Sequence, residues 1–165
     1  PFWKGLGFSL VHIASGKGKS SGRQTIALLF TESEAVNNDI KALQVKIKKY
    51  LPVWFLSYCN SMFWHDAESL LQLFQPEYIL DQQDLDEIAA FAFSYRGFEL
   101  SQASLQRFVI NRLCDDSTVK LETTEIAIVI EVVLLNRSLK NLSRPGNISG
   151  RKELINTLRQ IIKKL

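Results

Sequence analysis

A short segment near the N-terminus, Ser15 to Ser20, has the residue types that bind phosphate. Its sequence SGKGKS ends in Gly18-Lys19-Ser20, the order that closes the phosphate-binding loop GxxxxGK[S/T]. That loop also needs a glycine five residues before Gly18, where this chain has Ile13, and a helix after the loop, where this chain has a second strand-like run. The spacing therefore does not predict a nucleotide-binding site.

The same loop is basic, and this suggests a different chemistry. Lys17, Lys19 and Arg23 lie in a Gly- and Ser-rich stretch between two apolar runs. Cations on such a loop could contact the phosphates of a nucleic acid without reading its sequence. The composition is equally typical of a solvated loop without a partner, so both interpretations stay open.

A second candidate for nucleic-acid binding is the segment 101–113. It begins with short polar residues, continues with an arginine and then an apolar anchor, and so locally resembles the recognition helix of helix-turn-helix proteins. That resemblance implies that four side chains face a DNA groove: Gln102, Ser104, Gln106 and Arg107. The turn at 97–101 is long for this motif, and Phe93 is bulky at a position where close packing of the two helices usually requires a small residue. A plain helical hairpin is the favoured interpretation.

Residues that could catalyse a reaction are sparse. The two histidines, His12 and His65, are far apart in sequence, and neither belongs to a pair of ligands at i, i+4 spacing. His65, Asp66 and Glu68 are more typical of a helix surface than of a metal site. A serine or cysteine nucleophile would need His12 or His65 as its base, and nothing in the local sequence supports such a pair. The sequence predicts no enzyme activity, no cofactor and no metal.

Composition indicates an ordinary globular domain. Of 165 residues, 46% are hydrophobic and 22% are charged, and the net charge of +3 is too weak to identify a partner. Cys59 and Cys114 lie in apolar helical patterns, which predicts buried, reduced thiols in a cytoplasmic protein. No apolar stretch is long enough to span a membrane. The initial Pro1, in place of methionine, indicates an excised or processed domain.

Periodicity predicts a mainly α fold, roughly six helices with an N-terminal β-hairpin, as one α+β domain over 1–165. Two apolar runs around the basic loop predict the hairpin in 1–31. Helical spacing predicts the helical body in 32–165, with helices at 31–51, 52–74, 81–97, 101–113, 118–135 and 149–165.

Some of these helices carry further expectations. The first has an apolar stripe that includes Tyr50, and Thr31 and Glu34 have capping-box spacing at its start. Pro52 should end it or begin the next helix, which we expect to be central and buried from Trp54 to Phe74. The segment 118–135 has a β-branched run that favours a strand, but its length and glutamates favour a buried helix continuing beyond Leu135, which we prefer.

The last helix shows one long apolar stripe that contains Leu154, Leu158, Ile161 and Leu165. Such a stripe must be buried on the domain's own core or on a partner. We therefore expect a non-enzymatic interaction module that binds a protein partner or a second copy of itself through helical surfaces. The alternative is a nucleic-acid-binding domain that uses the basic hairpin loop and the 101–113 helix.

Overall fold

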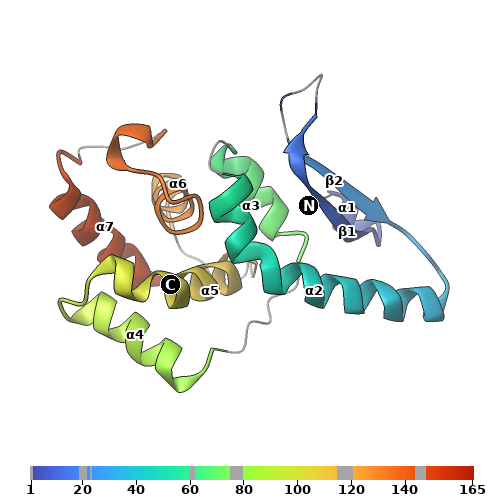
Figure 1. The fold of residues 1–165 in the computed structure, drawn as a ribbon, viewed down its shortest axis with the longest axis horizontal. Coiled ribbons are helices and arrows are strands. Elements are labelled where there is room, and N and C mark those ends of the chain that lie inside the picture. The colour runs from blue at the N-terminus through green and yellow to red at the C-terminus, as the bar shows by residue number, and fades with distance from the viewer. Residues whose placement is uncertain are drawn as a thin grey trace.

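A β-hairpin and a long helix form one end of the molecule, and a group of shorter helices forms the other (Figure 1). The computed structural model describes residues 2–18, 22, 24–59, 62–74, 80–114, 121–143 and 148–165. Within these ranges the chain is mainly α with an N-terminal antiparallel hairpin, which confirms the predicted fold class. Helix α3 (Trp64–Leu71) lies between the two ends.

The hairpin pairs β1 (Ser9–Lys17) with β2 (Gln24–Leu29), after a single helical turn, α1 (Phe2–Gly5). Ser9 lies opposite Leu29 and Ile13 opposite Ile26, with irregularities on either side of Ile13. Gly7 joins α1 to β1 at a positive φ of 82°, where a side chain would be strained and would also meet the ring of Phe30 at 3.3 Å.

Most of the remaining chain is helical. The helices after the hairpin are α2 (Glu34–Tyr58), α3, α4 (Gln82–Phe93), α5 (Phe98–Cys114), α6 (Thr123–Val129), the π-helical turn η1 (Ile130–Leu134), the 3₁₀ turn η2 (Leu139–Asn141) and α7 (Arg151–Lys164).

Helix α2 differs from the prediction at both of its ends. It starts at Glu34 after the N-cap Ser33, whose backbone N–H donates to the Thr31 hydroxyl at 3.1 Å, so Thr31 is not the cap. It also continues through Pro52, where a break was expected. Leu51 and Phe55, on either side of the proline, are fully buried, and this packing outweighs the backbone hydrogen bond that proline cannot make.

The centre of the core is formed by α5, α6 and η1. Val129, Ile130, Val133 and Leu134 are all fully buried. The preference for helix over strand is therefore correct for 123–134, while residues 118–120 of the predicted helix lie outside the described residues. The helix ends at Leu134, with Leu135 as its C-cap, and the chain turns at Asn136, whose φ is +50°. The expectation that a single helix over 54–74 is the central one is wrong, because α2 and α3 share that stretch and α2 is largely exposed.

Helices α4 and α5 keep the predicted hairpin arrangement with shifted boundaries. The Asp81 carboxylate accepts from the Asp84 N–H at 2.8 Å, which confirms Asp81 as the N-cap of α4. Helix α4 ends at Phe93, before Gly97, and α5 begins at Phe98, before Ser101. Ser101 is therefore inside α5, and its hydroxyl donates to the Glu87 carbonyl of α4 at 3.4 Å.

The two cysteines are buried and form no disulfide, as predicted. Burial raises the pKa of the Cys114 thiol to about 11, so the thiol stays protonated at neutral pH. Within the described ranges, no helix is both long and apolar enough to cross a bilayer.

Candidate nucleic-acid interface

Two of the four side chains predicted to face a groove are buried in the structure. Ser104 is 2% exposed, and its single hydroxyl proton is shared between the carboxylates of Asp84 at 2.7 Å and Glu87 at 2.8 Å. Gln106 is 3% exposed and donates to the Val133 carbonyl at 3.0 Å. Helix α5 packs into the core with these polar groups satisfied inside it, so the groove-facing arrangement is wrong for both residues.

The other two α5 residues are more accessible. Arg107 pairs with Asp84, and hydrogen bonding to this guanidinium holds the pKa of the Asp84 carboxyl below its usual value. Gln102 is half-buried, and its side-chain amide donates a hydrogen bond to the side-chain oxygen of Asn136, after η1, at 3.4 Å. Contact of Gln102 or Arg107 with nucleic acid stays a prediction.

The basic hairpin loop lies at the margin of what the structure describes. The Lys17 backbone ends β1, opposite Gln24, while Lys19 and Arg23 are outside the described residues. Their role in phosphate contact therefore also stays a prediction.

The stripe of α7 is used within the domain. Leu154, Leu158 and Ile161 are buried in the core, and Leu165 packs against it. Arg159 fixes the helix further by donating to the Phe91 carbonyl at 3.0 Å and the Arg96 carbonyl at 3.2 Å. The expected partner-binding stripe is therefore not a free surface.

A cleft of about 650 Å³ opens between α5, η1, η2 and α7, and we call it the α5–α7 cleft. It brings together residues that are far apart in sequence. Its lining is mixed polar and apolar: Phe98, Glu99, Gln102, Val132, Asn136, Arg137, Ser138, Leu139, Lys140, Arg151, Leu154 and Ile155.

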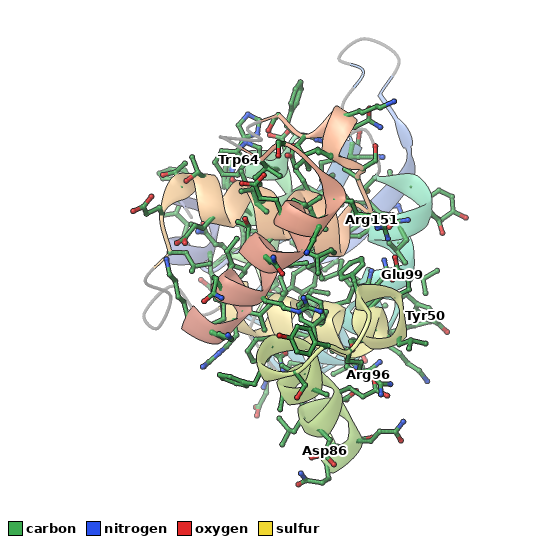
Figure 2. All side chains as sticks on the ribbon, turned by 90° about the vertical axis from the view of Figure 1, so that its left-hand side faces the viewer. Tyr50, Trp64, Asp86, Arg96, Glu99 and Arg151 are labelled. Carbon is green, nitrogen blue, oxygen red and sulfur yellow. The ribbon has the colours of Figure 1, made fainter. Side chains whose placement is uncertain are left out.

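The cations of the α5–α7 cleft are held with different strength. Arg137 donates to the fully buried Glu131 carboxylate at 2.5 Å and to the Met62 carbonyl at 2.5 Å, so its position is fixed. Arg151 pairs with Glu99, but the two side chains are 75% and 63% exposed. Figure 2 shows this pair at the surface. An exposed pair contributes little, so Arg151 can exchange Glu99 for a phosphate. Lys140 is exposed and makes no ion pair with any described residue.

A smaller cleft of about 300 Å³ lies between the hairpin and α2, and we call it the hairpin–α2 cleft. One wall comes from β1 and the other from one face of α2, at helical spacing. Its lining residues are Val11, His12, Ile13, Leu43, Lys46, Ile47, Tyr50, Leu51 and Trp54. Tyr50 is 56% exposed, and Figure 2 shows it at the margin of the molecule.

The surrounding helices differ in charge. Helix α2 carries four lysines between positions 41 and 49, while its acidic residues, Glu34 and Asp39, precede them. Helix α4 has Asp84, Asp86 and Glu87 and no basic residue. On α4, Asp84 and Glu87 are paired with Arg107 and Arg96, so the net charge that would favour a polyanion is the positive charge along α2.

Comparison with known proteins decides between the two predicted functions. A family model described as a tRNA-binding domain matches residues 27–165. The chain belongs to this family of tRNA-binding domains. Family membership points to RNA as the partner and overturns the main prediction of a protein-partner module; the nucleic-acid alternative was the better one.

Two relatives are both tRNA(Met) cytidine acetyltransferases named TmcA. The protein from Yersinia pestis (strain D106004) is 34% identical over 113 residues, which cover 67% of this chain and 15% of the relative. The protein from Nitrosococcus halophilus (strain Nc4) is 25% identical over 168 residues, which cover 99% of this chain and 22% of the relative. The chain thus corresponds to less than a quarter of either relative.

Sequence reasoning missed both clefts. The α5–α7 cleft joins Gln102, Lys140 and Arg151 only through the fold, so no local motif could have indicated it. The hairpin–α2 cleft had a local signal, since Lys46, Tyr50 and Trp54 repeat every four residues on one helix face. The described residues hold no cluster of His, Cys, Asp or Glu that could bind a metal.

Proposed function

We propose that this chain holds tRNA for modification elsewhere in a longer protein and performs no chemistry itself. The observation that carries the proposal is the family match over residues 27–165. The names of the relatives support tRNA(Met) as the RNA and acetylation of a cytidine as the modification. Such a substrate would place the chain in the cytoplasm.

The α5–α7 cleft is the proposed site for the sugar–phosphate backbone. Lys140 and Arg151 supply exposed positive charge, and the amides of Gln102 and Asn136 supply donors to phosphate or ribose. Phosphate contacts of this kind give affinity that falls with salt. The fixed Arg137–Glu131 pair would shape the floor of the cleft and add little net charge.

The test is binding of a fluorescently labelled tRNA, followed by anisotropy at several salt concentrations. The double variant Lys140→Ala/Arg151→Ala should bind more weakly and with a flatter salt dependence than the wild type. Glu99→Gln should bind more tightly, because it frees Arg151 and removes a negative charge from the cleft. Lys163→Ala, an exposed lysine near the end of α7 that lines neither cleft, is the control and should change least.

Two results would count against this function. The wild-type chain could fail to bind tRNA at low salt, or the double variant could bind as the Lys163→Ala control does. Modification of tRNA by this chain alone, in the presence of an acetyl donor, would contradict the proposal that it performs no chemistry.

A further inference from the structure

The hairpin–α2 cleft is too small for a paired RNA helix but large enough for one aromatic ring system. Its volume of about 300 Å³ lies at the lower end of small-molecule sites, roughly 300–1,000 Å³. The apolar walls come from Val11, Ile13, Leu43 and Ile47. A flat apolar ligand therefore fits the walls better than a phosphate or a charged side chain.

Aromatic residues give this cleft a stacking surface. Tyr50 and Trp54 are one helical turn apart on the same face of α2. Tyr50 is exposed although it belongs to the apolar stripe, and Trp54 is half-buried against the core. Bases of single-stranded nucleic acids stack on exposed aromatic rings of this kind.

One donor of the cleft is left without a partner. The indole N–H of Trp54 is buried and makes no hydrogen bond with any described residue. A buried donor without an acceptor is costly and rare, which suggests that a ligand atom completes it. The edge of a nucleobase carries carbonyl and ring-nitrogen acceptors that could do so.

Charge distinguishes a nucleotide from other flat apolar ligands. Lys46 lines the cleft one turn before Tyr50, and Lys49 is exposed beside Tyr50. Neither lysine makes an ion pair with a described residue. A base stacked on Tyr50 and Trp54 would bring its own phosphate next to these cations, whereas an apolar peptide would leave them unused.

We propose that the hairpin–α2 cleft binds one unpaired nucleobase of the bound RNA, stacked on Tyr50 and Trp54, with its phosphate at Lys46. This inference rests on the proposed tRNA binding and assigns a separate part of the interface. The α5–α7 cleft would hold the backbone, and the hairpin–α2 cleft would select RNA that has an accessible, unpaired base.

The test compares three RNA probes on the whole chain: tRNA, a single-stranded oligonucleotide and a blunt, fully paired RNA of equal length. Tyr50→Ala should weaken binding of tRNA and of the single strand by roughly 5- to 150-fold, the range for loss of one base–aromatic stack. Binding of the paired RNA should not change. Tyr58→Ala is the matched control, since Tyr58 is 51% exposed on the same helix and lines neither cleft.

Two further variants separate stacking from folding. Tyr50→Leu keeps the apolar bulk but removes the ring, so it should lose single-strand binding while its melting temperature stays at the wild-type value. Trp54→Phe keeps a ring but removes the N–H, and it should weaken single-strand binding by roughly 5-fold, the loss of about one hydrogen bond.

The outcomes also separate this inference from the proposed function. If the Lys140→Ala/Arg151→Ala variant loses tRNA but both Tyr50 variants behave as Tyr58→Ala does, the base site is wrong and tRNA binding stands. Equal loss of paired and unpaired RNA by Tyr50→Leu would also overturn the base site. If the wild type binds none of the three probes, both proposals fail together.

Discussion

The two ends of the molecule differ in how their charged side chains are paired. In the body formed by α4 to α7, the buried carboxylates are paired, as in Asp84–Arg107 and Glu131–Arg137, although the apolar side chains of Phe93 and Leu100 are 74% and 69% exposed. On α2, Val45 and Val53 are 67% and 61% exposed, and Lys46 has no ionic partner among the described residues. The body therefore holds its buried carboxylates in ion pairs, whereas Lys46 on α2 is available to a ligand.

This difference has a consequence for stability. Elements with few buried apolar contacts open at lower free energy than a packed core does. Helix α2 buries only Ile40, Leu51 and Phe55 along its whole length, while the shorter α7 buries Leu154, Leu158, Ile161 and Ile162. We therefore expect α2 to be the more dynamic helix and RNA binding to stabilise it more than it stabilises the body.

The largest contrast should come from apolar truncations in the two regions. Ile161→Ala in α7 removes a fully buried side chain and should lower the free energy of unfolding by roughly 2–5 kcal/mol. Val45→Ala on α2 should change it by less than about 0.5 kcal/mol, because Val45 is mostly exposed. Urea denaturation measures both. Equal losses of unfolding free energy would show that α2 is packed as tightly as α7, and the proposed difference between the two ends would be wrong.

A second contrast concerns ion pairs. Glu131→Gln removes the charge beneath Arg137, whose side chain is only 13% exposed, and should cost about 3 kcal/mol because a nearly buried guanidinium loses its counter-charge. Glu99→Gln breaks the exposed pair with Arg151 and should cost less than about 1 kcal/mol. The same denaturation series compares the two variants. A larger loss of stability for Glu99→Gln would mean that the exposed Glu99–Arg151 pair, and not the Glu131–Arg137 pair, stabilises the α5–α7 cleft.

A third contrast uses pH. Hydrogen bonds from Arg107 and Ser104 to Asp84 lower the pKa of that carboxyl below the value of about 3.9 in an unfolded chain. The unfolded state therefore takes up a proton first as pH falls, and the stability from this contact, fully present above about pH 5, is lost as pH falls through the folded pKa. The melting temperature of Asp84→Asn should be below that of the wild type at pH 5, and the difference should shrink as the pH is lowered to 3. Asp39→Asn, an exposed change on α2, is the control for the removal of a carboxylate. Parallel curves for Asp84→Asn would contradict the proposed role of the Asp84–Arg107 pair.

Features with local causes could be predicted from the sequence. The hairpin follows from two apolar runs around a Gly-rich loop, the start of α4 from Asp81, and the burial of α7 from the spacing of Leu154 to Ile161. The helical state of 123–134 follows from its length and its glutamates, in spite of the β-branched side chains. The mainly α fold class was therefore accessible without the structure.

Features with distant causes could not be predicted. Ser104 and Gln106 look like surface residues on a recognition helix, but the carboxylates of α4 and the Val133 carbonyl satisfy them in the core. Pro52 looks like a helix break, but tertiary packing of Leu51 and Phe55 holds the helix through it. The choice of RNA over a protein partner came from the family match, because a net charge of +3 does not distinguish the two.

The smallest expected effect compares single charges in the two clefts. Each phosphate contact adds about 0.7 to 0.9 to the slope of log affinity against log salt concentration. Lys46→Gln in the hairpin–α2 cleft and Lys140→Gln in the α5–α7 cleft should therefore each flatten that slope for tRNA by slightly less than one unit. For fully paired RNA only Lys140→Gln should do so, because a paired base cannot bring its phosphate to Lys46 by entering the hairpin–α2 cleft. Anisotropy titrations at four or more salt concentrations resolve a change of this size. If Lys46→Gln flattens the slope equally for paired and unpaired RNA, then Lys46 contacts the phosphate backbone whether or not a base is unpaired. Both clefts would then bind the phosphate backbone alone.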